Sequence, residues 1–577
     1  MTLEQTGPPR SKDNTVAREA GDCQDVDGTL ESITGRRTAH GTAAEGLARL
    51  IKSNPALYRT AVALLLVLAS ALYLKQFGNY QVGMEWDDAQ YVQLAQSIAL
   101  GRPYVVDTGS GVILPTRYPF GFPLILAPVY ALSNGNFEAL KSVSLVFTLA
   151  SVVLILVGWE YLGLPSRWFG LATAALYALS PQVTAMSREV MSEPAFTFFV
   201  LLGLIITISV SLDQHTDLVK CIGLGIIWLL ASNVRIIGFA FVAASVLYLL
   251  LRRKWSTLAL SVLGFAITLT SIISLTSLHW SDTYNVRIYL DELTGKRILE
   301  QNGVATGLIP RAWQGLVDYQ SYLRDSLVPF VGSSSIQSAL SRFGLAPVLG
   351  MVSGFVFILL VIGYVDNLRR RSALPALGFV AFYGIVTIAW SYRGERFLFG
   401  ILPFLFGYLL IAGNQLLKVV MPKMGRVMRG LIPFLGVGAV ILFIGLQFAA
   451  SMRTESWVGH TRNFEIGASW IRENTPPDAF VVAEHNEIIH LYAGRATGPL
   501  PDTTVSLVSS LPSHRSVYLL VAPEIEWSPT GALRYTERTQ LFREALKTGV
   551  LPADLVYDNE PAMVMVYRLR PVMDTAH

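Results

Sequence analysis

The sequence predicts an α-helical, polytopic membrane protein that carries a small α/β domain at its C-terminal end. Three observations lead to this fold class. Hydrophobic residues make up 52% of the 577 and charged residues only 15%, which is far more apolar than a soluble protein of this length. Eleven runs approach the roughly 20 apolar residues needed to cross a hydrocarbon core. From about residue 455 the composition becomes polar, and helix and strand periodicities alternate.

The N-terminal segment 1–55 is expected to be a disordered tail on the cytoplasmic side. It is rich in Thr, Gly, Asp, Glu and Arg and has no apolar periodicity. No signal peptide is evident, so the first apolar run, 61–74, is interpreted as an uncleaved first span. The only two cysteines, Cys23 and Cys221, offer neither a disulfide framework nor a Cys-ligated metal site.

The transmembrane domain is expected to occupy residues 56–450 with about 11 helices. The apolar segment 120–132 is short and holds Pro123 and Pro128, which favours a juxtamembrane or re-entrant helix over a full span. Counts of 11 and of 13 spans both remain compatible with the sequence. We expect the spans near 60–79, 142–162, 167–184, 190–212, 218–233, 235–251, 256–279, 345–364, 374–391, 396–416 and 430–450.

Basic residues assign the two sides of the membrane. With the N-terminus in the cytoplasm, the basic clusters at 252–254, 369–371 and 418–429 all fall in cytoplasmic loops, as the positive-inside rule requires. Making 120–132 a full span would move all three clusters outside. We therefore predict a multi-pass protein of the cell (inner, cytoplasmic) membrane. Its exoplasmic side would carry the first loop 80–137, the long loop 280–343 and the α/β domain 455–577.

Two adjacent acids, Asp87 and Asp88, follow the first span. Apolar residues recur after them at helical spacing, so they occupy the first turn of a short amphipathic helix. The helix dipole stabilises a carboxylate in the first turn. This explains one acid better than the pair, and it leaves the neighbouring Trp86 and the later Arg117 unexplained. A third acid, Glu193, stands before a proline at the start of a later span, where capping of free N–H groups is the alternative explanation.

Arginines also gather on the predicted exoplasmic side, and they favour an anionic substrate. Guanidinium groups suit phosphate because they offer fixed, bidentate donors. For Arg188, Arg393 and Arg396, snorkelling to the membrane interface is the alternative explanation. A polar cavity that held a lipid phosphate and a sugar would need a base for the acceptor hydroxyl, cations for the departing phosphate and protection from water. The candidate cations are Arg117, Arg188, Arg393 and Arg396, joined by Arg235 at the start of a span.

The C-terminal segment has the pattern of a compact α/β domain. Helical periodicity covers 464–473 and 539–547, and strand-like runs cover 480–483, 517–521, 555–557 and 563–567. No glycine-rich phosphate loop follows any of these strands, so a nucleotide-binding role is unsupported and no nucleic-acid partner is expected.

Four segments, taken in order, carry a resemblance to a known family. They read WDDAQYVQLAQSIALGRPY, RYPFGFPLILAPVYAL, SPQVTAMSREVMSEPAFTFFVLL and RGERFLFGILPFLFGY. Their order resembles that of the bacterial polyprenyl-phosphate-dependent glycosyltransferases of the GT-C superfamily, relatives of the protein O-mannosyltransferases and lipid A aminoarabinose transferases. The resemblance covers roughly residues 60 to 420 and rests most on the acidic first loop.

The resemblance implies roles for several residues. The family's catalytic acid maps onto Asp87, with Asp88 beside it, and its second acid maps onto Glu193. Its basic residue maps onto Arg117, although this chain has Arg-Tyr-Pro where many relatives have Lys-Pro-Pro. Arg235, Arg393 and Arg396 are further candidates for the donor phosphate, and Trp86, Tyr91 and Tyr118 are candidates for contact with substrate. The implied activity is inverting hexosyl or pentosyl transfer.

Asp87 is the expected general base that accepts the proton of the acceptor hydroxyl. Asp88 points about 100° away if both lie on a helix, so we expect it to cap the helix or to bind a metal. Asp87, Asp88 and Glu193 could together hold a divalent cation, but monophosphate-linked donors require none, and no cofactor is predicted with certainty.

The leading hypothesis is a membrane enzyme that moves one sugar from a polyprenyl-phosphate donor to an exoplasmic lipid, glycan or protein. A transporter or flippase of an anionic lipid-linked sugar is the alternative from another class, against which the absence of a convincing internal repeat counts. A surface-glycan polymerase or ligase is a third hypothesis, which differs in using a preassembled, diphosphate-linked donor.

Overall fold

The computed structural model describes most of the chain after residue 53. The tail predicted for 1–55 lies almost wholly outside the described residues, as does the first part of the long loop predicted at 280–343. The described residues are 54–78, 80–83, 85–110, 113–114, 116–275, 308–332, 334–370, 373–390, 393–423, 426–453, 463–504, 506–507, 515–525 and 533–570.

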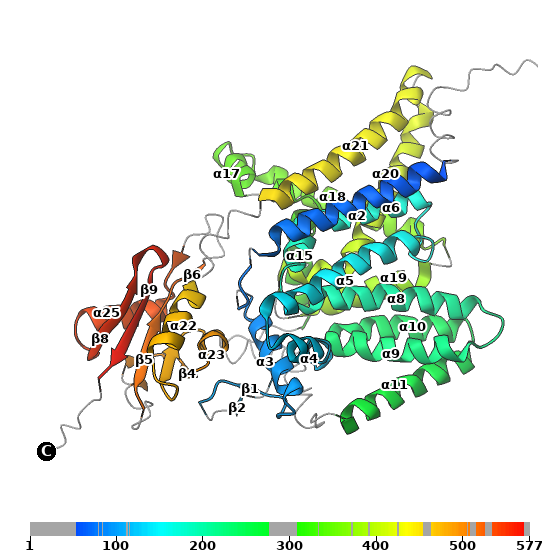
Figure 1. The fold of residues 1–577 in the computed structure, drawn as a ribbon. Helices are drawn as coiled ribbons and strands as arrows, with labels where there is room; N and C mark the ends of the chain where they lie inside the picture. The colour runs from blue at the N-terminus through cyan, green and yellow to red at the C-terminus, as the bar shows by residue number, and fades with distance from the viewer. Residues whose placement is uncertain are drawn as a thin grey trace, which may run out of the picture. The chain divides into compact units, whose positions relative to one another are not determined.

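Helices dominate the described chain up to residue 453 (Figure 1). In chain order they are α2 (Pro55–Phe77), α3 (Asp87–Ala99), α4 (Gly121–Ser133), α5 (Phe137–Val157), α6 (Arg167–Ala178), α7 (Pro181–Met186), α8 (Ser192–Leu212), α9 (Leu218–Val234), η1 (Ile236–Gly238), α10 (Phe239–Leu251), α11 (Trp255–Leu275), α15 (Leu308–Leu327), α16 (Pro329–Gly332), α17 (Ser334–Arg342), α18 (Ala346–Asn367), α19 (Leu374–Ala389), η3 (Glu395–Ile401), α20 (Leu402–Val420), η4 (Met421–Lys423) and α21 (Arg426–Arg453).

A helix lies at every one of the eleven predicted spans, and seven described helices are long and apolar enough to cross a membrane. Three of the other predicted spans coincide with shorter apolar helices, α9, η1 with α10, and α19. The remaining one, predicted as 167–184, is divided: α6 ends at Ala178 and α7 starts afresh at Pro181. Proline lacks the N–H that would continue the first helix but suits the first turn of the second. The short helix predicted at 120–132 is α4.

Local sequence explains where several helices begin. Asn54 caps α2 by accepting hydrogen bonds from the N–H groups of Ala56 and Leu57 at 3.0 and 3.1 Å, and Pro55 occupies the first helical position. Asn136 caps α5 in the same way, accepting from the N–H of Ala139. Side-chain oxygens at these positions satisfy donors that a helix leaves unpaired at its N-terminus.

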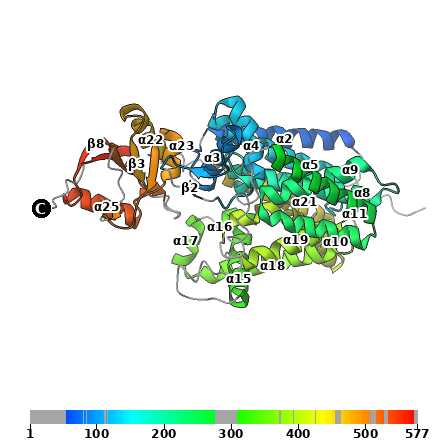
Figure 2. The same ribbon diagram turned by 90° about the horizontal axis from the view of Figure 1, so that it is seen from below.

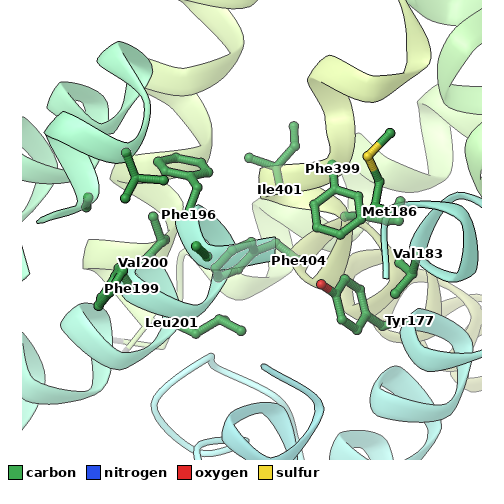
Figure 3. Packing of buried hydrophobic residues seen from close by; sticks show 14 of the residues in the cluster. Tyr177, Val183, Met186, Phe196, Phe199, Val200, Leu201, Phe399, Ile401 and Phe404 are labelled. Atoms are coloured by element: carbon green, nitrogen blue, oxygen red, sulfur yellow. The ribbon is translucent and has the colours of Figure 1, made fainter. Parts of the chain in front are cut away.

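Buried aromatic and aliphatic side chains join the helices into one core. Phe196 and Phe199 of α8 pack with Phe399 of η3, Phe404 of α20 and Tyr177 of α6, as Figure 3 shows. Helices α5, α8, α9 and α10 lie side by side (Figure 1). This core packs α8 against both η3 and α9, and the candidate site is formed at the polar start of α8.

The C-terminal segment folds as the predicted α/β domain around a mixed five-stranded sheet of order β4-β3-β5-β9-β8. Strands β4, β3 and β5 are parallel, and β9 and β8 continue the sheet antiparallel. The elements are α22 (Asn463–Asn474), β3 (Phe480–Ala483), α23 (Asn486–Ala493), β4 (Ala496–Pro499), β5 (Val517–Val521), α25 (Glu537–Lys547), β8 (Ala553–Asn559) and β9 (Val564–Leu569). All four predicted strands and both predicted helices are present, whereas α23 and β4 were not predicted.

Alternation along the strands gives this sheet two apolar faces. Val481 and Leu520 pack beneath α22 and α23, while Val482 and Leu519 pack against Phe542 of α25. The helices accordingly cover opposite faces of the sheet (Figures 1 and 2).

Two small antiparallel pairs complete the described strands. In the first loop, β1 (Val106–Asp107) pairs with β2 (Ile113–Leu114), and within the C-terminal domain β6 (Glu524–Ile525) pairs with β7 (Leu533–Arg534). The described part of the long loop is helical, comprising α15, α16 and α17.

Candidate active site

A tight backbone turn presents Asp87 at the start of α3. The preceding residue, Trp86, has φ 60° and ψ −48°, and the N–H of Asp87 donates to the carbonyl of Glu85 at 2.6 Å. A three-residue turn of this hand is rare and strained for a residue with a side chain. Asp87 therefore follows a strained residue, whose backbone conformation the surrounding structure has to maintain.

Asp87 accepts hydrogen bonds from two separate parts of the chain. One carboxylate oxygen accepts from the Tyr118 hydroxyl, and the Nη2 of Arg117 lies 3.4 Å from the same oxygen. The other oxygen forms an ion pair with Arg396, which lies 309 residues away in the sequence. The Asp87 side chain is 12% exposed.

Burial by itself raises the pKa of Asp87, but the Arg396 charge, the Tyr118 hydrogen bond and Arg117 outweigh it and leave the pKa below its ordinary value. This carboxylate is therefore ionised at neutral pH. Burial and the neighbouring Asp87 charge raise the pKa of the Tyr118 hydroxyl, which keeps it protonated as a donor.

Glu193 is the second buried acid at the site, and it pairs with two arginines. Its Oε1 lies 2.5 Å from Nη1 of Arg235 and 3.3 Å from Nε of Arg396. The same Arg235 nitrogen donates to Ser192 at 3.1 Å, and Ser192 shares a 3.0 Å hydrogen bond with Tyr91. Arg396 thus links both acids of the predicted site, one on α3 and one at the start of α8.

Two close backbone approaches bring these elements together. A Cβ on Gly121 would lie 2.5 Å from the backbone of Asn233, so the start of α4 abuts the end of α9, beside Arg235. A Cβ on Gly400 would lie 2.5 Å from the ring of Phe196, so η3 sits directly on α8. Only glycine permits either approach.

A cavity of about 370 Å³ opens between these side chains. One carboxylate and four arginines line it together with aromatic and aliphatic groups, so its charged lining is mainly cationic. The lining residues are Asp87, Tyr91, Arg117, Tyr118, Pro119, Val234, Arg235, Ile236, Ile237, Val386, Thr387, Trp390, Arg393, Arg396 and Phe397.

Most of the predicted site residues converge on this cavity. Arg117 lines it with a side chain that is 40% exposed, more than that of any other arginine in the lining. Arg393 lines it as well, but its guanidinium also pairs with Asp318 of α15 and donates to the carbonyl of Arg311 at 2.9 Å. Tyr91 and Tyr118 contribute their rings, whose centroids lie 4.9 Å apart.

Four predicted residues do not line the cavity: Glu193, which pairs with Arg235 and Arg396, and Asp88, Trp86 and Arg188. Asp88 is fully buried behind the turn, where its carboxylate accepts from the N–H of Gly83 at 2.7 Å and the Tyr80 hydroxyl at 2.8 Å. The Trp86 ring lies against His485 instead, with centroids 4.5 Å apart. Arg188 is buried, and its Nη1 donates to Gln76 at 3.4 Å. Asp88 therefore shapes the loop rather than facing a substrate.

A third acid beside Arg396 was not predicted from the sequence. Glu85 lies 3.5 Å from its Nη1, two residues before Asp87 in the motif GMEWDD, where its position could have suggested a role. Burial raises the pKa of Glu85 to about 7, against the opposing Arg396 charge. Burial also raises the pKa of Asp88 to about 6, although the hydrogen bonds from Gly83 and Tyr80 oppose it.

The oxygens of Asp87 and Asp88 are directed at protein partners. The Asp87 oxygens face Arg396, Tyr118 and Arg117, and the Asp88 oxygens accept from the loop that they fold. Within the described part of the chain, no three His, Cys, Asp or Glu side chains group to hold a metal ion. These carboxylates are therefore assigned to ion pairs and hydrogen bonds.

Solved structures with this architecture were found at low sequence identity. ArnT from Cupriavidus metallidurans in the apo state matches with a TM-score of 0.50 and 13% identity, covering 91% of this chain and 98% of that one. The archaeal oligosaccharyltransferase AglB from Archaeoglobus fulgidus, in complex with an inhibitory peptide and a dolichol-phosphate, matches with a TM-score of 0.50 and 13% identity, covering 83% and 74%. The chain has the GT-C fold.

The GT-C fold confirms the fold class predicted from the sequence, although the exact number of spans is not established by it. No protein-family model and no curated protein matches the chain. At 13% identity the likeness is one of fold, and a shared fold does not by itself imply a shared reaction.

Proposed function

We propose that this chain is a polyprenyl-phosphate-dependent membrane glycosyltransferase that passes one sugar to an exoplasmic acceptor hydroxyl with inversion. The observation that carries the proposal is the ion pair of Asp87 with Arg396 at the wall of a cavity that three further arginines line. A base beside a cationic surface is the arrangement that displacement of a phosphate from a sugar requires.

In the proposed reaction, the acceptor oxygen attacks the anomeric carbon of the donor sugar. Its proton moves to the free electron pair of the Asp87 carboxylate as the new C–O bond forms. The bond between the anomeric carbon and the phosphate oxygen breaks, and the phosphate departs with the electron pair. Attack on the side opposite the phosphate inverts the sugar. Asp87 is suited to this role because it is ionised at neutral pH and borders the cavity.

The arginines have separate parts in this proposal. Arg117 is the foremost candidate for the donor phosphate, because its side chain is 40% exposed and lines the cavity. Arg235 is held by Glu193 at 2.5 Å and faces the cavity from the other side. Arg396 orients Asp87 and offsets the negative charge of Glu193. Arg393 connects the cavity wall to α15 through its ion pair with Asp318.

A polyprenyl-phosphate donor is supported by two points. The cavity is cationic and borders apolar residues of α19 and η1, which suits a phosphate on a lipid chain. The AglB structure of the same fold holds a dolichol-phosphate. The predicted location in the cell membrane, with the N-terminus cytoplasmic, would place the cavity on the exoplasmic side.

The testing experiment combines cells and purified protein. Lipid-linked and surface glycans are compared between a deletion strain and one restored with the full chain. The glycans that differ between the two strains identify the donor and the acceptor. The purified protein is then given that donor and acceptor, and free polyprenyl phosphate is measured. Release that requires both the acceptor and Asp87 supports the proposal. Movement of the donor across vesicles without release of polyprenyl phosphate would identify a transporter instead.

A further inference from the structure

The C-terminal domain forms two hydrogen bonds with the segment that carries Asp87. The hydroxyl of Tyr492 in α23 donates to the carbonyl of Val82 at 2.9 Å, before the turn. The side-chain amide of Gln93 in α3 donates to the carbonyl of Glu487 at 2.8 Å, after it. Tyr492, Gln93 and Val82 are all buried. The two hydrogen bonds therefore fix the acid-bearing segment on both sides of Asp87.

The same segment also packs against apolar side chains of the C-terminal domain. Ala89, two residues after Asp87, is fully buried in the core cluster of the C-terminal domain together with Ile488. Gly83 has φ +108°, and a Cβ there would lie 2.7 Å from a methyl group of Ile488. The backbone before the turn thus lies directly against α23, and α3 shares its first turn with the core of another domain.

The strained residue of the turn is also held by this domain. The Trp86 ring, although 55% exposed, lies against His485, which in turn contacts Phe464 with ring centroids 5.2 Å apart. A left-handed backbone at a residue with a side chain persists only where its surroundings fix it. Here Asp88 and Tyr80 fix the turn from within the loop, and α23 with the residue that precedes it adds contacts from the C-terminal domain.

We propose that Tyr492 and Gln93 are positioning residues, through which the C-terminal domain holds the Trp86 turn and so keeps Asp87 against Arg396 and the cavity. This inference rests on the proposed function for its catalytic consequence, but the mechanical part stands on the contacts alone. In this proposal the domain contributes to sugar transfer by positioning Asp87, and none of its residues contacts the reacting atoms.

The test uses the full-length protein and two variants that remove hydrogen bonds while keeping volume, Tyr492→Phe and Gln93→Leu. Tyr535→Phe is the matched control, because the Tyr535 hydroxyl also donates to a backbone carbonyl of the domain, that of Met563 at 2.7 Å, without contact to the turn. Amide hydrogen exchange of residues 80–90, binding of undecaprenyl phosphate and the amount of glycan product in restored cells are measured for each.

Each test variant should speed amide exchange in 80–90 about 2- to 10-fold, the usual weight of one hydrogen bond, and the double variant should exceed both. Glycan product should fall in parallel, while the affinity for undecaprenyl phosphate stays within about 2-fold, since the arginines keep their places. Tyr535→Phe should change none of the three quantities.

A double-mutant cycle with Trp86→Gly adds a readout that a purely structural role would not move. Glycine adopts positive φ without strain, so Tyr492→Phe should slow transfer less in the Trp86→Gly background than in the native one. Equal losses in both backgrounds would overturn the strain argument.

Three outcomes overturn the proposal as a whole. They are unchanged exchange in both test variants, faster exchange with undiminished product, and an equal effect of Tyr535→Phe. Failure of the native protein to form any glycan is a separate outcome, which rejects the proposed function and the effect of positioning on catalysis. The amide exchange of residues 80–90 would then still test whether the two hydrogen bonds hold the turn.

Discussion

Replacing Asp87 by asparagine tests the proposed chemistry most directly. The amide keeps the size of the side chain and an oxygen that accepts from Tyr118, but it removes the basicity and the charge that pairs with Arg396. Loss of a general base lowers turnover by about 10²- to 10⁴-fold, which corresponds to about 2.7–5.4 kcal/mol of barrier. We expect kcat to fall by at least about 10²-fold.

The structure also sets how much stability this variant should lose. Breaking a buried ion pair costs about 3–5 kcal/mol when the remaining charge is left alone. Arg396 is not left alone, since Glu193 lies 3.3 Å from its Nε. We therefore expect a loss of about 1.5–3 kcal/mol, the weight of one hydrogen bond to a charged group. The variant should fold and still bind undecaprenyl phosphate.

The assay is turnover of purified protein with defined donor and acceptor, beside thermal unfolding in the same detergent. Asp88→Asn is the matched control, because Asp88 is buried behind the turn and accepts from Gly83 and Tyr80. It should lower the unfolding temperature while its effect on kcat stays milder. Near-normal turnover of Asp87→Asn in folded protein would refute the assignment of the base and make Glu193 the next candidate.

Three further predictions concern the donor, pH and topology. Arg117→Ala should raise the donor KM by about 10- to 100-fold through loss of a charged contact, and Arg117→Lys should recover part of it; an unchanged donor KM in both would assign the phosphate to other arginines. Folded Glu85 and Asp88 hold protons up to pH values of about 7 and 6, whereas unfolded carboxyls release theirs near pH 4, so the folded protein binds more protons in this window and its stability should fall as pH rises from about 4.5 to 7. Glu85→Gln should flatten the upper part of that curve in thermal unfolding, and an unaltered curve would contradict the role of this acid. Reporter fusions after Arg371 and after Tyr567 should report opposite sides of the membrane, and matching signals would reject the predicted topology.

The sequence by itself determined the positions of the helices and most of the strands. Apolar runs long enough for a bilayer have one stable backbone, the helix, because every N–H and C=O has to be satisfied within the segment. Short, continuous apolar runs located β3 and β5 to the residue. The helix α23 was not predicted because its eight residues are too few for a clear period.

The sequence also singled out the acids and arginines, but only the tertiary structure decided their partners. Asp87 and Asp88 are adjacent in the chain, yet one borders the cavity and the other is buried behind the turn. Helical geometry predicted their divergence of about 100° without telling which one faces the cavity.

The partner of Asp87 could not be predicted from any local pattern. Arg396 is expected from the sequence to contact the donor phosphate, and the structure adds that its guanidinium pairs with both Asp87 and Glu193 at the cavity wall. Periodicity specifies which face of a helix is buried, but an ion pair depends on the angle and height at which two distant helices meet. The contact of Tyr492 with Val82, 410 residues apart, is of the same kind, since it exists only because two segments far apart in the sequence share one core.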